Sequence, residues 1–514
     1  MMESRYILSV DVGTTTIRGH VYNEKAELVG ESIRKLDFIV PQRGYVEIVP
    51  ESLWAQFLAV GAEAITNSKV PASKIDALGI SVQRATFTTW NKHTMAHYHN
   101  FISWNDTRSA QYTDSVNRAY TFRGLKGGAK ILKWITGSRR YEAASVFSFT
   151  AQLVIMRLCW VLDNIKGIRE DLANGDVLFG TIETWLVWKL TKGKVHATDP
   201  SNLSATGLYD LFIANWNSIH MNYLGLPRSL LPEIRDTSGD FGICSEEFFG
   251  ADIPIRALVG DQQGALFGQC CFDSGDVKLT LGTGAFMVVN TGKMPSVPAR
   301  GAYPLVAWRI KGEICYAMEC NQSDCGTVVE WGAAMGYYKS PAESEELAKS
   351  VDSSGGVYFV PAFKGLLAPV NDLCACACLV GLTPKTRPAH VTRAMLESIM
   401  FRCKQLYELQ KVVSRVKLNP TIRVNGGASQ NNFLLQLAAN LLKNPIERAS
   451  NLDMSCLGAA FLAGLSAGVW KDKEELKRLR KTDVTFQPQP ITGEEREFGM
   501  WERALQRGAK WYTD

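Results

Sequence analysis

The sequence predicts an α/β protein with at least two domains, built by duplication of one α/β unit. The chain has 514 residues, which is more than a single hydrophobic core usually serves. Strand-like runs that end in glycine or polar residues alternate with helical runs. One strand–turn–strand pattern occurs twice, about half the chain apart. These three observations favour two related α/β domains.

The composition is that of an ordinary folded protein. Apolar residues make up 46% and charged residues 21% of the chain, close to globular averages. The net charge is only +5, and no run is dense enough to bind a polyphosphate chain, so we expect no nucleic-acid partner. The most charged run, 471–481, mixes both signs at helical spacing and is expected to be a solvated helix face.

Three features predict a cytoplasmic protein without a membrane span. The first residues lack the apolar core of a signal peptide. The longest small-apolar stretch, 457–469, is too short to cross a bilayer and suits a tightly packed buried helix. The twelve cysteines read as reduced thiols. Among them, Cys374, Cys376 and Cys378 could share one face of a strand, and a metal site there is the minor alternative.

The repeated pattern is a strand, a short turn rich in Gly and Thr, and a returning strand. Its two copies are 7–12, 13–16 and 17–22, and 277–281, 282–284 and 285–289. Such a turn exposes backbone N–H groups and hydroxyls that suit phosphate oxygens, although a single copy could equally be an ordinary hairpin turn. The second copy, and Asp11 before the first turn as a partner for hydrated magnesium, favour nucleotide binding.

Asp261 stands between a strand-like run, 255–260, and a helical run, 264–267. An Asp at this position is often only a helix N-cap. However, ligands of open α/β sheets collect at the carboxyl ends of strands, and a kinase that activates a hydroxyl needs a carboxylate near the attacking oxygen. The position therefore predicts Asp261 as a general base.

Two further segments suggest ligand contacts. Arg84 follows the strand-like run 75–82, and Trp104 ends another apolar segment; a guanidinium beside an indole can hold a small polyol, while a surface ion pair is the alternative for Arg84. Paired glycines in 425–431 precede a helical run and allow close approach of a nucleotide, or form a plain loop. We find no Walker-type loop and no protein-kinase motif set.

Together these motifs resemble the glycerol kinases of the FGGY carbohydrate kinase family over nearly the whole chain. The matching stretches are DVGTTTIR (11–18), GISVQR (79–84), SW (103–104), FGTIETWLVWKL (179–190), GDQQGALFG (260–268), LGTGAF (281–286) and NGGASQNN (425–432). QRATF (83–87) and NFISW (100–104) look most similar to the divergent type five branch. The resemblance implies two actin-like, ribonuclease-H-like domains, 1–269 and 270–514, with ATP in a cleft between them and the polyol in the first.

The resemblance also implies roles for individual residues. The phosphate-loop positions of the first domain are Thr14, Thr15 and Arg18. The other nucleotide contacts are Thr283, Gly326, Gly427 and Asn431. The carboxylate on the metal side is Asp11. The glycerol-site positions are Arg84, Trp104, Asp261, Gln262 and Phe286, with Asp261 as the general base.

The chain departs from the family pattern at a few of these places. Ala85 stands where Glu is usual, Gln152 where Tyr is usual, Asn425 where Asp is usual and Glu330 where Gln is usual. The expected activity is phosphorylation of glycerol by ATP with Mg²⁺. A kinase for another small polyol or sugar, and a catalytically weak ATP-binding regulator, are the alternatives. A homodimer is compatible with all three.

Overall fold

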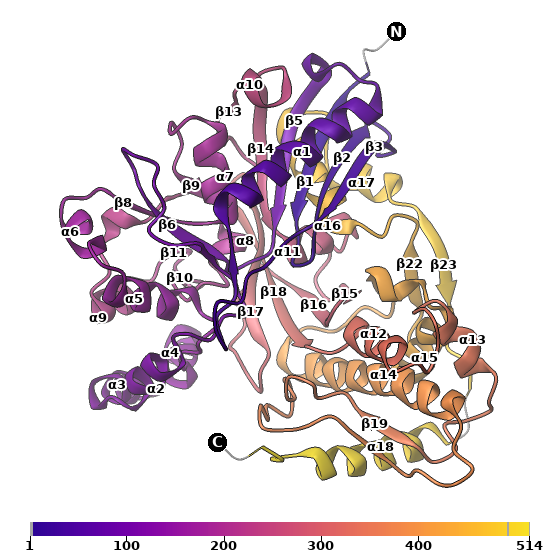
Figure 1. Ribbon diagram of the computed structural model, residues 1–514. Helices are drawn as coiled ribbons and strands as arrows, with labels where there is room; N and C mark the ends of the chain where they lie inside the picture. The colour runs from indigo at the N-terminus through magenta and orange to yellow at the C-terminus, as the bar shows by residue number, and fades with distance from the viewer. Residues whose placement is uncertain (1–3, 491–492, 513–514) are drawn as a thin grey trace. The chain divides into compact units, whose positions relative to one another are not determined.

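The computed structural model describes residues 4–490 and 493–512, and the chain divides into two compact units. The first unit contains the chain up to Cys270 together with Leu305–Tyr316 and Met454–Arg480, and the second contains the rest. The sequence-based division at 269/270 assigned both of these short segments to the second domain, whereas their contacts join them to the first unit. Each unit combines a mixed sheet with helices (Figure 1), so the predicted α/β fold class is confirmed.

The part of the first unit up to Cys270 contains fourteen strands among its described residues. They are β1 (Tyr6–Val12), β2 (Thr16–Asn23), β3 (Leu28–Lys35), β4 (Glu47–Ile48), β5 (Ile75–Val82), β6 (Phe87–Asn91), β7 (Phe101–Ile102), β8 (Val177–Thr181), β9 (Ala197–Thr198), β10 (Tyr209–Asp210), β11 (Asn215–Trp216), β12 (Glu233–Ile234), β13 (Ile243–Cys244) and β14 (Ile253–Gly260). The main sheet has the order β13-β14-β5-β1-β2-β3, in which β1, β5 and β14 are parallel. A second sheet has the order β4-β7-β6-β8.

The helices of the first unit cover these sheets. They are α1 (Pro50–Ser68), α2 (Ala110–Arg118), α3 (Tyr120–Thr136), α4 (Arg139–Val146), α5 (Val154–Asn164), α6 (Ile168–Ala173), α7 (Ile182–Leu190), α8 (Pro200–Leu203), α9 (Ser218–Leu224), α10 (Glu246–Phe249), α11 (Asp261–Gly268), α16 (Met454–Ala467) and α17 (Lys473–Leu479). None of the described helices is both long enough and apolar enough to cross a bilayer.

Glycines let two helices lie directly on opposite faces of the main sheet. A Cβ at Gly19 would lie 2.3 Å from the carbonyl oxygen of Val60 in α1. A Cβ at Gly79 would lie 2.4 Å from the carbonyl oxygen of Ala459 in α16. Successive side chains of a strand point to opposite faces, and these two glycines belong to neighbouring rows of the sheet. Helix α16 is therefore part of the first unit's core although it comes late in the chain.

Helices α11 and α16 approach each other closely for the same reason. A Cβ at Gly458 would lie 1.8 Å from the carbonyl oxygen of Gly264, and one at Gly268 would lie 2.3 Å from that of Met454. A side chain at either position would therefore push the helices apart. Helix α11 begins at Asp261, so this packing fixes the helix that carries the predicted general base.

The second unit is built on a sheet with the order β17-β18-β16-β15-β21-β22-β23. Its strands are β15 (Val277–Leu281), β16 (Ala285–Gly292), β18 (Glu313–Gln322), β19 (Tyr358–Val360), β20 (Cys378–Val380), β21 (Ile422–Asn425), β22 (Ile446–Ala449) and β23 (Thr482–Phe486). Strand β17 (Tyr303–Ile310) and the start of β18 include residues of the segment Leu305–Tyr316, which belongs to the first unit. Its helices are α12 (Gly326–Ala334), α13 (Glu343–Lys349), α14 (Pro388–Val413), α15 (Asn432–Leu442) and α18 (Glu494–Gly508).

The two main sheets share one topology, as the repeated hairpin predicts. In the first, β1 pairs antiparallel with β2 and parallel with β5, which pairs parallel with β14. In the second, β15 pairs antiparallel with β16 and parallel with β21, which pairs parallel with β22. An antiparallel strand, β13 or β23, then follows in each. The duplication of one α/β unit is confirmed.

Most of the other predicted elements agree with the structure. Segment 457–469 forms most of the buried helix α16, and the charged run 471–481 forms α17, in which only Leu476 is buried. Cys374, Cys376 and Cys378 do not share one face of a strand, because strand β20 begins at Cys378 and leaves Cys374 and Cys376 outside it. Among the described residues, no group of three His, Cys, Asp or Glu side chains could hold a metal.

Candidate active site

The first Gly-Thr turn carries a charged pair at its base. Asp11 lies opposite Arg18 in the antiparallel register, and the guanidinium Nη1 is 3.8 Å from the carboxylate Oδ2. The Asp11 residue is only 4% exposed. Gly13 donates its N–H to the carbonyl oxygen of Thr16 at 3.0 Å and so closes the turn. The predicted Asp11 and Arg18 are therefore adjacent, with Thr14 and Thr15 at the tip.

A chain of hydrogen bonds connects this turn to the predicted polyol-binding residues. Gln83 Nε2 donates to the carbonyl oxygen of Gly13 at 3.0 Å, and Gln83 Oε1 accepts from Thr86 Oγ1 at 3.2 Å. Thr86 Oγ1 in turn accepts the backbone N–H of Trp104 at 3.1 Å. The indole Nε1 of Trp104 donates to Thr14 Oγ1 at 3.3 Å. The structure thus brings a predicted polyol contact and a predicted phosphate contact into direct contact.

Arg84 and Asp261 form the second pair of predicted residues that meet. The Nε atom of Arg84 lies 3.5 Å from Asp261 Oδ1, and the two side chains are 10% and 20% exposed. A Cβ at Gly260 would lie 2.8 Å from two carbons of the Arg84 side chain, so the glycine leaves room for it. Asp261 Oδ1 also accepts the backbone N–H of Gln262 at 2.7 Å. Asp261 is the first residue of α11 rather than its N-cap, which is Gly260.

Two buried polar residues, Ser201 and Asp199, hold the backbone next to Asp261, and the sequence did not predict this role. Ser201 Oγ accepts the backbone N–H of Gly260 at 2.9 Å, and the carbonyl oxygen of Ser201 accepts from Gln263 Nε2 at 2.9 Å. Asp199 holds Ser201 by accepting its N–H at 2.9 Å, and burial raises the pKa of Asp199. The Asp-Pro pair at 199–200 signals a helix start, but nothing local signals the contact with Gly260.

Arg157 is a second functional residue that the sequence reasoning missed. Its buried guanidinium donates to the backbone carbonyl oxygens of Ala85 (2.8 Å), Ser103 and Gln152. Burial lowers the pKa of Arg157 to about 9. This side chain thus joins the two segments that carry Arg84 and Trp104. A single Arg within the apolar run 154–162 was the available signal.

Two of the departures from the family pattern lie in this group. Ala85 is 8% exposed and has a φ of +60°, a left-handed conformation that is uncommon outside glycine. Its carbonyl oxygen is held by Arg157, as is that of Gln152. Ala85 lacks the carboxylate that the family's usual Glu would supply at this position. Its backbone is nevertheless fixed by a hydrogen bond from Arg157.

The second Gly-Thr turn lies against the start of a helix. Gly326 donates its N–H to the carbonyl oxygen of Gly282 at 2.9 Å, and Cys325 donates to that of Thr283 at 3.0 Å. A Cβ at Gly326 would lie 2.8 Å from the Gly282 oxygen. Two predicted nucleotide contacts, Thr283 and Gly326, are therefore neighbours, and Gly326 must be a glycine for the contact to exist.

The glycine pair after β21 lies beside the same turn. Gly426 has a φ of +95°, and a Cβ there would lie 2.5 Å from the carbonyl oxygen of Leu281. A Cβ at Gly427 would meet nothing within 4 Å, so space is open at that position. Asn431 is the N-cap of α15, and its Oδ1 accepts the N–H of Leu434 at 3.0 Å. Thus Asn431 has a structural role in addition to the predicted ligand contact.

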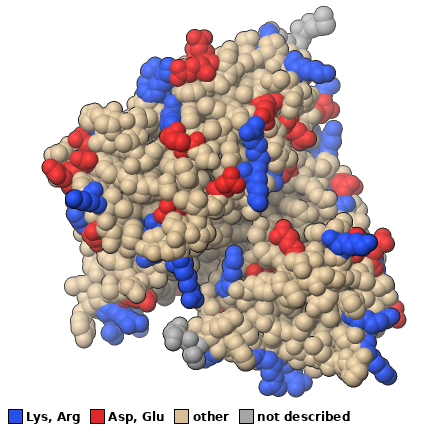
Figure 2. Space-filling model, in the orientation of Figure 1, with Lys and Arg blue, Asp and Glu red and all other residues tan. Residues whose placement is uncertain are grey.

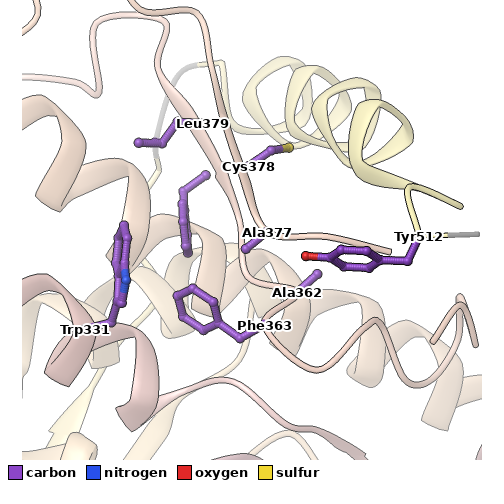
Figure 3. A pocket seen from close by; sticks show the side chains of 8 residues that line it. Trp331, Ala362, Phe363, Ala377, Cys378, Leu379 and Tyr512 are labelled. Carbon is purple, nitrogen blue, oxygen red and sulfur yellow. The ribbon is translucent and has the colours of Figure 1, made fainter. Parts of the chain in front are cut away.

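The remaining predicted residue, Phe286, lies on β16 of the second unit, opposite Thr280. The other predicted polyol contacts belong to the first unit. The second unit also contains an open pocket of about 400 Å³, lined by residues that include Trp331, Phe363 and Tyr512 (Figure 3). None of the predicted site residues lines it.

Comparison with known proteins identifies the family. The model of the FGGY carbohydrate kinase N-terminal domain matches residues 6–268, and that of the C-terminal domain matches residues 277–467. These matches span most of the chain. The protein therefore belongs to the FGGY family of carbohydrate kinases.

Individual relatives cover nearly the whole chain. Glycerol kinase 5 of Bos taurus is 46% identical over 508 residues, which cover 99% of this chain and 96% of the relative. Glycerol kinase 2 of Thermotoga maritima is 38% identical over 510 residues, covering 99% of each chain. The crystal structure of Plasmodium falciparum glycerol kinase with ADP matches with a TM-score of 0.86 at 27% identity, covering 98% of each chain. The predicted resemblance is confirmed.

Proposed function

We propose that this protein transfers the γ-phosphoryl group of ATP to a primary hydroxyl of glycerol, with Asp261 as the general base. The observation that carries the proposal is the placement of Asp261 at the start of α11, 3.5 Å from Arg84 and backed by Gly260 and Ser201. The glycerol kinases at 38% and 46% identity support the choice of substrate.

The residues of the first unit bind the polyol and activate it. Arg84 donates to hydroxyl oxygens, and the Trp104 ring packs on carbon atoms. The Asp261 carboxylate accepts the proton of the attacking hydroxyl as its oxygen bonds to the γ-phosphorus. The bond from that phosphorus to the oxygen bridging it to the β-phosphate breaks, and ADP leaves with the electron pair. Arg157 holds the segments that position Arg84 and Trp104.

The residues of the second unit bind the nucleotide. Thr283 offers a hydroxyl and backbone N–H groups to phosphate oxygens. Gly427 leaves open space for close approach of a ligand, and Gly326 holds the turn in place. Thr14 and Thr15 of the first unit supply a second set of hydroxyls for the transferred group. These assignments rest on the geometry of each turn together with the family's motif positions.

The residues around Asp11 fit Mg²⁺ as kinases use it. Asp11 is a buried carboxylate at the end of β1, and within residues 4–490 and 493–512 no cluster of three ligating side chains could hold a metal without phosphate. This matches a hard cation held by one carboxylate, water and substrate phosphates. When bound, Mg²⁺ would neutralise charge on the β- and γ-phosphates.

A substrate panel tests the proposal. The protein would be incubated with ATP, Mg²⁺ and glycerol, dihydroxyacetone, erythritol, xylitol, gluconate or xylulose, with ADP release measured and products identified by mass spectrometry. We expect the highest kcat/KM with glycerol and a product phosphorylated on a primary carbon. A higher value with another polyol would favour the alternative that Ala85 suggests, a reshaped pocket. Absence of phosphoryl transfer to every substrate in the panel would favour the other alternative, a catalytically weak ATP-binding regulator.

We also propose that the protein acts in the cytosol. All twelve cysteines are free thiols, and most of them are buried. Free thiols persist in a reducing compartment, whereas secreted proteins form disulfides. Cell fractionation with a cytosolic and a secreted marker tests this location, and recovery with the secreted marker would contradict it.

A further inference from the structure

Helix α3 exposes an apolar stripe on the side that faces away from the core. Phe122 and Ala129 are its buried residues, and the Phe122 ring packs on Phe149 at 5.0 Å between centroids. Ile131 follows Phe122 by nine residues, about two and a half helical turns, and so lies on the opposite side. The apolar side chains on that side are mostly exposed.

The exposure of this stripe is high for such large side chains. Tyr120 is 89%, Ile131 60%, Trp134 87% and Ile135 66% exposed. At 3.6 residues per turn these four residues fall within about a third of the helix circumference. Isolated surface apolar residues need no explanation, but a contiguous set that includes an exposed Trp marks an interaction surface. We call these four residues the outer α3 stripe.

The segment that contains the stripe is strongly basic. Between Ser115 and Tyr141 there are seven Lys or Arg residues and no Asp or Glu. The whole chain carries only +5, so the residues outside this segment together carry −2. Figure 2 shows blue side chains beside tan surface at the lower left, where Figure 1 places α2 and α3. Of these seven residues, Arg123 and Lys130 lie on α3 next to the Trp134 edge of the stripe, whereas Lys126 and Lys133 lie nearer the Phe122 side of the helix.

Most of this charge is available to a partner. Within the described chain, Arg118, Arg123 and Lys130 make no ion pair, whereas Lys133 lies 3.4 Å from Glu142 and Arg140 lies 2.9 Å from Asp210. Arg118, Arg123 and Lys126 line an open hollow of about 440 Å³ together with Asn117. Such a hollow suits an anionic group, and it adjoins the helix that carries the stripe.

We propose that the outer α3 stripe and its basic flank form a docking surface for an anionic lipid bilayer. Trp and Tyr favour the boundary between headgroups and acyl chains, and apolar side chains on one helix face enter it to a depth of about 5–10 Å. Lys and Arg beside them are attracted to anionic headgroups. The helix has 17 residues and carries lysines, so it lies in the plane of the interface rather than across it.

The stripe fits a bilayer better than a protein groove. Gly124, Gly127 and Gly128 lie between the apolar residues, and a Cβ at any of them would meet nothing within 4 Å. The helix thus presents a few large side chains on an otherwise smooth surface, which a fluid interface accommodates without shape complementarity. Arg123 and Lys130, which have no ion-pair partner among the described residues, add attraction to anionic headgroups.

Vesicle sedimentation with the full chain tests the proposal. Vesicles of phosphatidylcholine with phosphatidylserine would be compared with vesicles of phosphatidylcholine alone, at low and at high salt. We expect the protein to sediment with the anionic vesicles and to be released by salt, since screening weakens contacts of exposed charges. Lys130→Ala should weaken the partition coefficient by about fivefold, the effect expected for one basic residue near an anionic surface.

Matched variants distinguish binding through this surface from nonspecific adsorption to the vesicles. The double variant Trp134→Ser/Ile135→Ser should lose most of the binding, whereas Trp511→Ser removes an equally large exposed ring from the second unit and should bind as the unmodified chain does. Lys471→Ala is the matched control for charge. Thermal unfolding checks that each variant is folded, without reliance on the proposed enzymatic activity.

Three results would overturn the proposal. One is absence of sedimentation with anionic vesicles at low salt. Another is binding that the Trp134→Ser/Ile135→Ser variant retains in full. The third is a dimer in sedimentation velocity that this variant converts to a monomer, because the stripe would then be covered by a second copy of the chain.

Discussion

The two Gly-Thr hairpins hold equivalent places in two sheets of the same topology, yet their surroundings differ. At the base of the first, Asp11 faces Arg18 across the strand pair; at the matching place of the second, Thr280 faces Phe286. The first turn has four residues between its last paired positions, and the second has three. The two copies thus share the backbone pattern, while the base of the first turn carries a charged pair and that of the second does not.

The contacts of the two turns differ in the same way. The side chains of Gln83 and Trp104 hold the first turn, in addition to the backbone N–H of Leu36, which donates to the carbonyl oxygen of Thr15 at 2.9 Å. Backbone groups hold the second, through the N–H of Gly326 and the closely packed Gly426. We therefore propose that the first turn serves the charge-dependent chemistry and that the second offers backbone N–H groups to phosphate. Four predictions test this division.

The largest expected effect is on the general base of the first unit. Asp261→Asn should lower kcat by about 100-fold or more, since general-base assistance is typically of that size, and should leave ATP affinity nearly unchanged. Steady-state kinetics on glycerol and calorimetry with ATP are the measurements. Asp352→Asn, an exposed site in the second unit, is the matched control. A near-normal rate for Asp261→Asn would remove this residue from its assigned role.

The charged and neutral hairpin bases should respond differently to loss of their polar group. Asp11→Asn removes the carboxylate proposed to face hydrated Mg²⁺, so the Mg²⁺ concentration for half-maximal rate should rise by about 10- to 100-fold. Thr280→Val at the equivalent place should leave that concentration unchanged. A magnesium titration of both variants decides the question, and equal shifts would show that the two hairpins do not differ in this role.

Restoring the missing carboxylate beside Arg84 sharpens the substrate assignment. If glycerol is held with one contact missing, Ala85→Glu should lower its KM by up to about 10- to 100-fold, the value of a charge-assisted hydrogen bond. Ala85→Gln is the uncharged control of the same size. Position 85 has a φ of +60°. The cost of this conformation should be similar for Ala, Glu and Gln and should cancel in the comparison. No gain on glycerol, with a loss on another polyol, would contradict glycerol as the native substrate.

The smallest expected effect concerns the cradle of the second unit. Thr283→Val should weaken ATP binding by about 1–3 kcal/mol if a phosphate oxygen loses its donor, and should leave the order of polyol preference unchanged. Calorimetry with ATP and the substrate panel measure the two properties. Unchanged affinity would mean that the backbone N–H groups of this turn are sufficient.

The sequence predicted these local motifs well because their signals are local. Gly and Thr between alternating apolar residues define each hairpin within ten residues, and β5 and β15 have the predicted bounds, 75–82 and 277–281. The pairing of Arg84 with Asp261 was reached only through the family resemblance, since 177 residues separate them. Motif patterns do not encode such distances.

The missed residues show what local patterns cannot provide. Arg157 and Ser201 act on backbone groups of Ala85 and Gly260, so neither partner's side chain identifies the contact. The predicted boundary at 269/270 placed residues 454–480 in the second domain, whereas they belong to the first unit. A single boundary cannot describe a chain that leaves one core, forms a second core and then returns to the first. The glycines of α11 and α16 allow these two helices to pack closely. The sequence alone does not show that the two helices meet.

That return determines when the first unit can be completed during synthesis. Ser455 Oγ donates to the carbonyl oxygen of Asp261 at 3.1 Å, so this partner of the proposed general base emerges from the ribosome long after Asp261 itself. At about 5–20 residues per second, the interval between Cys270 and Met454 is roughly 10 to 40 s. For that time the face of β5 at Gly79 has no helix on it, and a nascent chain at this stage needs protection from aggregation. The enzyme therefore acquires its activity at the end of translation, after the second unit has been made.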